Sequence, residues 1–166
     1  MQLPKRKAGD LPEKKFDPHI TQERHDDLEK NLEKMIKIIR PKLAKEVERL
    51  AQFGDFSENV EYQIAKGKLR GLNYRIDEVA NQINRAIIIT NDNNKDQVSL
   101  GHYVTVEVNG KQNQFQILGS SETNPTAGIV SRHSPIGKAL LGARVGETVH
   151  VQLTNKTVEY KILEIE

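Results

Sequence analysis

The chain has 166 residues, enough for one or two domains with apolar cores, and its formal net charge of +2 is too small to indicate a polyanion partner by itself. It contains no cysteine, which excludes a disulfide framework, a thiolate zinc site and a cysteine nucleophile. No apolar run approaches the ~20 residues of a membrane span, and the first residues lack an apolar signal core, so we expect a cytoplasmic protein without a membrane partner.

Composition divides the chain into four parts. Residues 1–19 are rich in lysine, proline and aspartate, which predicts a disordered basic tail. Residues 20–89 show helical periodicity, and residues 98–166 alternate between apolar and polar as strands do. The polar stretch of turn formers between them, residues 90–97, predicts a linker.

Two apolar stripes at helical spacing divide the helical part into two arms, and Pro41 in the first arm predicts a kink or a restart. The first stripe consists of Leu28, Leu32, Met35, Ile39, Leu43, Val47 and Leu50. The second is a heptad seam of Tyr62, Ala65, Leu69, Leu72, Ile76, Val79 and Ile83. The two stripes predict an antiparallel coiled-coil hairpin, a rod about 45 Å long if each arm has about 30 residues. Its tip would be residues 54–59.

The predicted tip, GDFSENVEY in residues 54–62, is acidic. Asp55 and Glu58 have the spacing of a capping box, with Asp55 as the N-cap and Glu58 reaching back to it, and acids in a first helical turn complement the helix dipole. The same carboxylates, held on an exposed tip, could also carry chemistry. The two interpretations are compatible.

Basic residues cluster on both arms behind the tip. They are Lys34, Lys37, Arg40, Lys42 and Lys45 on the first arm, and Lys66, Lys68, Arg70 and Arg75 on the second. Charge runs of this kind are usually solvated helix faces. In an antiparallel hairpin, however, the two runs would lie at similar heights and could merge into one cationic surface that holds a phosphate backbone.

The last part predicts a compact antiparallel sheet with one short helix, so the fold class is α+β. Ser134 as the N-cap, Pro135 at the first helical position and Gly142 after the last turn bound the helix. Asn109-Gly110 predicts a hairpin turn. The expected strands are residues 102–108, 114–118, 128–131, 149–153 and 158–165. The five histidines show no metal-ligand spacing.

Motifs in order along residues 20–166 resemble the Gre transcript-cleavage factors of bacteria. They are Ile20-Thr21, Arg40-Pro41, Gly54-Asp55-x-x-Glu58-Asn59-x-Glu61-Tyr62, Arg75-Ile76, Asn124-Pro125, Gly128-Ile129-Val130-Ser131, Ser134-Pro135-Ile136-Gly137-Lys138-Ala139-Leu140-Leu141-Gly142, Val145-Gly146-Glu147 and Glu159-Tyr160-Lys161-Ile162-Leu163. The chain departs from the family at Asn124, where Asp is usual, and at residues 154–156, which replace a Pro-Gly-Gly-like turn. The resemblance implies a coiled-coil hairpin followed by an FKBP-like domain.

The resemblance also implies a transcription elongation factor that is not itself an enzyme. The hairpin would enter the secondary channel of RNA polymerase and stimulate the polymerase's own cleavage of a backtracked RNA 3′ end. Asp55 and Glu58 would help to hold a Mg²⁺ ion shared with the polymerase active site and orient the attacking water. The isolated protein would bind no Mg²⁺ stably, and we expect a monomer that associates with the nucleoid through the polymerase.

Two further sets of residues carry over from the family. The residues implied to hold the RNA 3′ end are Lys66, Lys68, Arg70 and Arg75. The residues expected to dock at the channel rim are Pro125, Ser134, Pro135, Ile136 and Leu140.

Three alternatives stay open. A Gre-like inhibitor would occupy the same channel without cleavage activity, although the presence of Asp55 and Glu58 argues against it. An FKBP-like prolyl isomerase would need a pocket of clustered aromatics, and the last part of the chain keeps only Tyr103, Phe115 and Tyr160. A helical hairpin that binds RNA directly would show salt-sensitive affinity for RNA without the polymerase.

Overall fold

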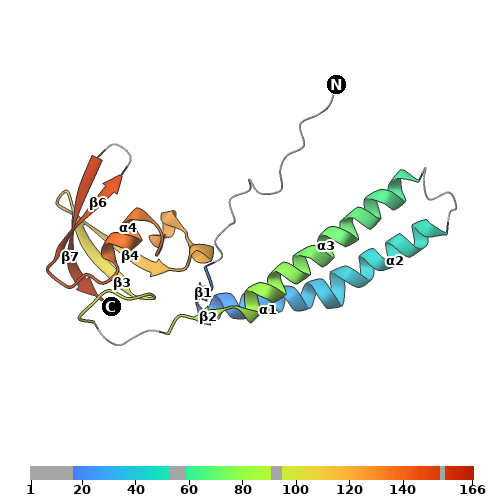
Figure 1. The fold of residues 1–166 in the computed structure, drawn as a ribbon, viewed down its shortest axis with the longest axis horizontal. Helices are drawn as coiled ribbons and strands as arrows, with labels where there is room; N and C mark the ends of the chain where they lie inside the picture. The colour runs from blue at the N-terminus through green and yellow to red at the C-terminus, as the bar shows by residue number, and fades with distance from the viewer. Residues whose placement is uncertain (1–16, 53–58, 91–94, 154–155) are drawn as a thin grey trace, which may run out of the picture.

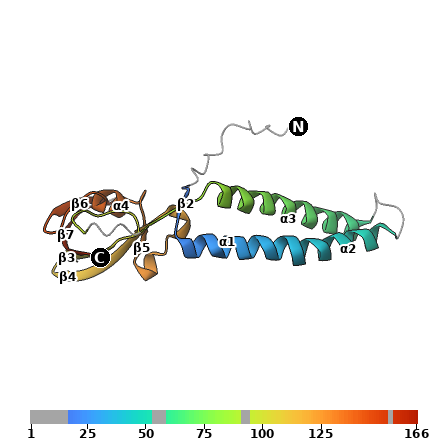
Figure 2. The ribbon, with the colours of Figure 1, turned by 90° about the horizontal axis from the view of Figure 1, so that it is seen from below.

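A helical rod projects from a small sheet domain (Figure 1). The computed structural model describes residues 17–52, 59–90, 95–153 and 156–166. The two arms of the rod lie side by side in both views (Figures 1 and 2), and a pair of short strands stands at the base of the rod. The predicted α+β class and the order of its two parts are confirmed. No helix within the described ranges is long and apolar enough to cross a membrane.

The first arm consists of α1 (Gln22–Lys34), a π-helical turn η1 (Met35–Ile39) and α2 (Arg40–Ala51). Pro41 has no N–H, so it cannot make the hydrogen bond one turn back that a continuous α-helix needs. The arm accommodates this locally: the Arg40 N–H reaches back five residues to the Met35 carbonyl, and helical dihedrals continue into α2. The predicted interruption therefore takes the form of a wide turn and leaves the arm unbroken.

The second arm, α3 (Val60–Asn84), packs on the first through the predicted seam. Every seam residue of both arms is buried or half-buried. The buried cluster of the rod lies in the half nearer the sheet domain and consists of Ile20, Leu28, Met35, Ile76 and Val79. The coiled-coil hairpin is confirmed, and buried seam residues occur near both ends of the rod, with Leu50 and Ala65 at the far end.

Short strands close the base of the rod. β1 (His19–Ile20) pairs in parallel with β2 (Ile87–Ile88), so the expected helical pattern up to Ile89 is wrong for its last residues. α3 ends at Asn84, and a run of three isoleucines follows. The branched side chains of these isoleucines favour extended backbone, which accounts for the difference.

The predicted disordered tail is wrong at its end, because the fold already includes Asp17. Asp17 is 6% exposed, and its carboxylate accepts hydrogen bonds from the backbone N–H of His19 (3.2 Å) and of Ser120 (3.1 Å). A carboxylate that caps backbone donors in this way holds the chain before β1 against the sheet domain. The rest of the predicted tail, residues 1–16, lies outside the described residues.

Five strands form the sheet, in the order β5-β4-β3-β7-β6. Their bounds are β3 (Tyr103–Val108), β4 (Lys111–Leu118), β5 (Ile129–Ser131), β6 (Thr148–Leu153) and β7 (Lys156–Ile165). The predicted turn joins β3 to β4, with positive φ at both Asn109 (51°) and Gly110 (75°). The pairs are antiparallel except β4–β5, which is parallel, a departure from the predicted antiparallel sheet.

Two 3₁₀ turns, η2 (Ser120–Glu122) and η3 (Pro125–Ala127), connect the parallel pair, because they return the chain to the level of Gln116, opposite which β5 begins. The predicted short helix is α4 (Pro135–Leu140), with Ser134 as its N-cap. α4 packs over the sheet (Figure 1). The largest fully buried side chains are Leu140 of α4 and, in the sheet, Val104, Val106, Ile117, Val151 and Ile162.

The rod and the sheet domain meet in a contact that we call the joint. It consists of Asp17, His19 and Thr21 on the rod side and Gly119, Ser120, Glu122, Arg132 and His133 on the sheet side. The Glu122 carboxylate accepts from the backbone N–H of Thr21 (2.9 Å) and from its hydroxyl, which also caps α1. A Cβ at Gly119 would lie 1.9 Å from the His19 carbonyl oxygen. Only glycine allows the two backbones to approach this closely.

Candidate functional site

The far end of the rod is the candidate site, and the structure describes its two flanks. Asp55 and Glu58, the predicted catalytic and metal-binding residues, lie outside the described residues, within 53–58. The flanking residues are Gln52, which caps the end of α2, and Asn59, which precedes α3.

Asn59 is the N-cap of α3. Its side-chain oxygen accepts a hydrogen bond from the backbone N–H of Tyr62 (3.0 Å), the arrangement expected of a capping asparagine. The prediction that Asp55 caps this helix, with Glu58 closing a capping box, is therefore wrong. Since Asn59 already accepts a hydrogen bond from a backbone N–H of the first turn, the helix does not need Asp55 as its cap.

The same asparagine also contacts the other arm. Its side-chain N–H donates to the backbone carbonyl of Leu50, 3.4 Å away in the last turn of α2. Leu50 and Ala65 are each 5% exposed, so seam residues of both arms are buried near this end of the rod. Sequence reasoning missed this bridge, because a capping residue alone does not predict which carbonyl of another helix it will reach.

A charge network surrounds the far end of the rod. Arg49 donates two hydrogen bonds to the Glu46 carboxylate, at 2.7 and 3.0 Å. These bonds hold the pKa of the Glu46 carboxyl below its usual range, with a smaller contribution from the charge of Lys68 on the other arm. The bond to Glu46 likewise raises the pKa of Arg49, and the charge of Glu61 adds to the effect. The flanks of the tip therefore carry charges of both signs on both arms.

All four predicted RNA-binding residues of α3 are exposed, but they do not share one flank. Successive helical residues are rotated by about 100°. Lys66 and Arg70 each follow a seam residue, and Lys68 and Arg75 each precede one, so the two pairs lie on opposite flanks of the seam. Lys66 stands over the ring of Tyr62, 5.6 Å from its centroid, whereas the charge of Lys68 acts on Glu46.

The basic run of the first arm is also exposed, at Lys34, Lys37, Arg40, Lys42 and Lys45. One member has a close acidic partner on its own helix, because Lys37 pairs with Glu33 one turn back. This pair leaves less free positive charge near the middle of the arm than the sequence indicates. The predicted merging of the two basic runs into one surface stays a prediction.

The expected docking residues fall into two groups. Pro125 in η3 and Pro135 at the start of α4 are exposed, whereas Ser134 and Ile136 are half-buried. The Ser134 hydroxyl accepts from the Gly137 N–H (3.0 Å), which confirms its role as a cap. Leu140 is 0% exposed in the core, so the prediction that it contacts a partner is wrong. Its side chain fills the space between α4 and the sheet.

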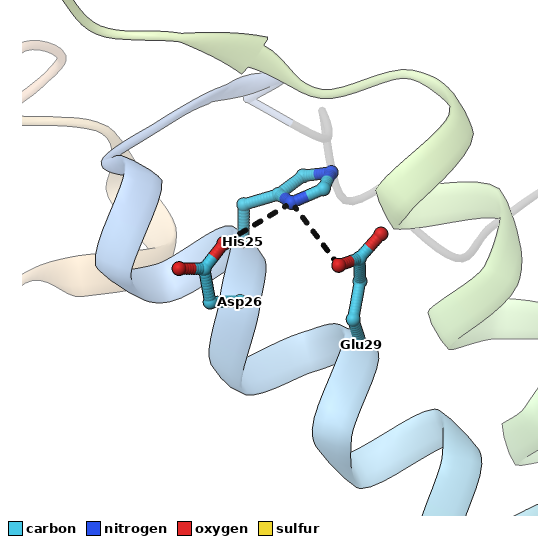
Figure 3. Close-up of side chains that lie close together, drawn as sticks. All are labelled: His25, Asp26 and Glu29. Atoms are coloured by element: carbon cyan, nitrogen blue, oxygen red, sulfur yellow. Dashed lines mark ion pairs between the residues drawn. The ribbon is translucent and has the colours of Figure 1, made fainter.

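His25, Asp26 and Glu29 come together on α1, at the end of the rod away from the tip (Figure 3). The His25 Nδ1 atom lies 3.8 Å from Asp26 Oδ1 and 4.0 Å from Glu29 Oε2, distances of loose ion pairs. Asp26 Oδ1 already accepts a hydrogen bond from Gln22 at 2.7 Å. The sequence analysis found no metal-ligand spacing among the histidines. It did not predict this group of one histidine and two acids within one turn of α1.

Comparison with known proteins identifies similar chains across both parts. The family "Transcription elongation factor, N-terminal" matches residues 19–88, and "Transcription elongation factor, GreA/GreB, C-term" matches residues 93–166. Transcription elongation factor GreA of Macrococcus caseolyticus is 39% identical over 149 residues, covering 88% of this chain and 94% of that protein. The GreA protein of Leuconostoc mesenteroides is 39% identical over 150 residues with the same coverage. The solved structure of GreA factor homolog 1 from Thermus thermophilus is 24% identical, with a TM-score of 0.41, covering 91% of this chain and 99% of that one.

Proposed function

Because the chain belongs to the GreA/GreB family of transcription elongation factors, we propose that it acts on RNA polymerase during elongation and rescues backtracked complexes. The rod enters the secondary channel of the polymerase, and the tip stimulates the polymerase's own cleavage of the extruded RNA 3′ end. The protein is then a cytoplasmic monomer that joins the nucleoid through the polymerase and performs no catalysis alone.

The observation that carries this proposal is the position of the acidic segment between the far ends of α2 and α3. Gln52 and Asn59 flank it at the end of a narrow two-helix rod, while the sheet domain stands at the opposite end (Figure 2). A rod with this shape can carry side chains into a channel that excludes the sheet domain. Asn59 already caps α3, so the start of this helix does not require a carboxylate from Asp55 or Glu58.

The donor set of the tip fits a magnesium ion held mainly by another protein. Mg²⁺ prefers hard oxygen ligands and commonly takes only one or two protein carboxylates beside water and phosphate. Bound in the polymerase active site, the ion would stabilise the attacking and leaving oxygens of RNA hydrolysis. Asp55 and Glu58 would add carboxylate oxygens at that place and orient the attacking water.

The remaining surfaces take supporting roles. The exposed basic residues of α3 attract the RNA 3′ end through its phosphates. The exposed Pro125 and Pro135, with the half-buried Ser134 and Ile136, form the part of the sheet domain that docks at the channel rim.

The direct test adds the purified full chain to stalled, backtracked elongation complexes and sizes the released RNA. We expect Mg²⁺-dependent release of short 3′ fragments, with the new 3′ end able to resume elongation. Release of no fragment, together with slower elongation, would instead identify a channel-binding inhibitor. Salt-sensitive binding of RNA in the absence of polymerase would favour a direct RNA binder.

A further inference from the structure

One side chain joins the two helix ends at the far end of the rod. The Tyr62 N–H belongs to the first turn of α3 and the Leu50 carbonyl to the last turn of α2, and such groups have no partner within their own helix's regular ladder. Asn59 accepts from the first at 3.0 Å and donates to the second at 3.4 Å. An amide side chain offers both an acceptor and a donor, whereas an ionised aspartate only accepts.

We propose that Asn59 is a positioning residue for the acidic tip. By bridging α2 and α3, it fixes the separation of the two points between which residues 53–58 run, the segment that contains Asp55 and Glu58. The inference rests on the proposed function, in which these carboxylates meet a metal ion and a water in the polymerase. Displacement of a reacting group by about 1 Å can lower a reaction rate about 10²-fold.

The capping role alone does not account for an asparagine at this position. Asparagine, aspartate and serine cap helices about equally well, so each could satisfy the Tyr62 N–H. Only asparagine among these three also has an N–H group that can reach the Leu50 carbonyl. Asn59 is itself half-buried, and its bridge ends on Leu50, a seam residue that is only 5% exposed.

The two functions of the side chain can be separated by substitution. Asn59→Asp keeps the acceptor for Tyr62 and adds a charge that the helix N-terminus favours, but it removes the donor to Leu50. Asn59→Ser also keeps a capping oxygen and removes the amide donor, without the new charge. Asn31→Asp makes the same chemical change on an exposed face of α1, far from the tip, and serves as the matched control.

The experiment measures RNA cleavage in backtracked complexes over a range of factor concentrations, with full-length protein. It yields the rate at saturating factor and the concentration that gives half of that rate, and it is repeated at several Mg²⁺ concentrations. We expect Asn59→Asp and Asn59→Ser to lower the saturating rate about tenfold to a hundredfold. The half-saturating concentration should stay within about twofold of wild type, which is within ~0.4 kcal/mol. Asn31→Asp should match wild type in both quantities.

Two outcomes would overturn the assignment. A saturating rate at the wild-type level in both Asn59 variants would show that the bridge does not position the tip. A loss that appears only in the half-saturating concentration, or that follows a lowered melting temperature, would reduce Asn59 to a structural cap. Failure of the proposed function is distinguishable from either, since the wild-type protein itself would then release no RNA.

Discussion

At the scale of single residues, different side chains near the tip can be assigned to helix capping and to chemistry. Several residues in its sequence, among them Asp55, Glu58 and Asn59, can cap a helix or complement its dipole, and the cap of α3 is Asn59. The acids are then unnecessary for starting α3. Glu61, in the first turn of the helix, takes part in the charge network around Arg49 and provides an internal comparison for the two acids of the tip.

The double substitution Asp55→Asn/Glu58→Gln tests this separation. It preserves side-chain shape and removes the anionic oxygens that a magnesium ion requires. We expect the melting temperature to change little, because Asn59 still caps the helix, while stimulated RNA cleavage falls by about two orders of magnitude or more. The variant should still compete with wild type for the polymerase. Glu61→Gln should retain most of the activity, and wild-type cleavage by the double variant would contradict the catalytic assignment.

A buried acid in the joint gives a second prediction at this scale. Burial alone would raise the pKa of the Asp17 carboxyl, but hydrogen bonds from His19 and Ser120 and the charge of Arg132 together hold it below its usual value. A carboxyl with a lowered pKa in the folded state adds stability at pH values above its unfolded pKa of about 3.9. That stability is lost as the pH falls through the folded value.

Asp17→Asn removes this dependence. Because the charge is lost and one of the two acceptor oxygens is replaced by an NH2 donor, the free energy of unfolding at pH 7 should fall by about 1–3 kcal/mol. The gap between variant and wild type should begin to narrow below about pH 4, where the carboxyl of the unfolded wild type takes up a proton, and should narrow further as the pH falls through the lowered folded pKa. Urea unfolding of both proteins from pH 7 down to pH 3 measures the gap. A gap of constant size would show that the charge of Asp17 does not matter.

At the scale of elements, α3 carries its basic residues on two flanks. One phosphate chain that follows the rod can contact one flank closely, so the four cations are expected to act as two unequal pairs. The charge of Lys68 helps to lower the pKa of Glu46, so the two groups interact, and the negative charge of Glu46 partly offsets the positive field on that flank. Lys66 and Arg70 form the pair that we expect to bind RNA more strongly.

Charge reversal of each pair tests this difference. Lys66→Glu/Arg70→Glu should weaken capture of the RNA 3′ end and reduce the slope of log affinity against log salt by about 1.4, the value for two contacts to a single strand. Lys68→Glu/Arg75→Glu should reduce the slope by less than half as much. Both variants should fold, since all four side chains are exposed. Equal slopes for the two variants would contradict the division into flanks.

At the scale of the whole molecule, the joint sets the direction of the rod relative to the sheet domain. Docking at a channel rim and reaching an active site at the same time require that these two parts keep one arrangement. The close approach of the Gly119 and His19 backbones and the capture of Thr21 by Glu122 hold the base of α1 in place. A change at the joint should therefore affect events at the tip.

Gly119→Ala tests this long-range effect, because its Cβ would lie 1.9 Å from the His19 carbonyl oxygen and β1 must move to accommodate it. We expect lower stability and a loss of cleavage stimulation larger than the loss of binding. Gly67→Ala, where a Cβ would meet nothing within 4 Å, should instead raise helix stability by about 0.5–1 kcal/mol. Thermal unfolding and the cleavage assay measure both effects. Unchanged cleavage by Gly119→Ala would show that the joint tolerates a shift.

The sequence predicted features that depend on local spacing. The seam from Tyr62 to Ile83 repeats at three and four residues, and the Asn109-Gly110 turn needs only its own two residues, so both were found. Asp17 was missed because its partner Ser120 lies 103 residues away. The cap was misassigned because Asp55 and Asn59 both suit the role. Leu140 was misplaced because a family motif does not show which of its side chains face the core.

The parallel pairing of β1 with β2 has a consequence for the order in which the rod opens. The amides of Ile87 and Ile89 donate to the carbonyls of Pro18 and Ile20, both at 2.8 Å, and these bonds close a loop that contains the entire rod. Closing so long a loop costs conformational entropy, and the few hydrogen bonds of the short strands must offset this cost. The seam, in contrast, is stabilised by side-chain contacts in every helical turn. In hydrogen exchange, the amides of Ile87 and Ile89 should therefore lose protection before the seam amides around Ile76.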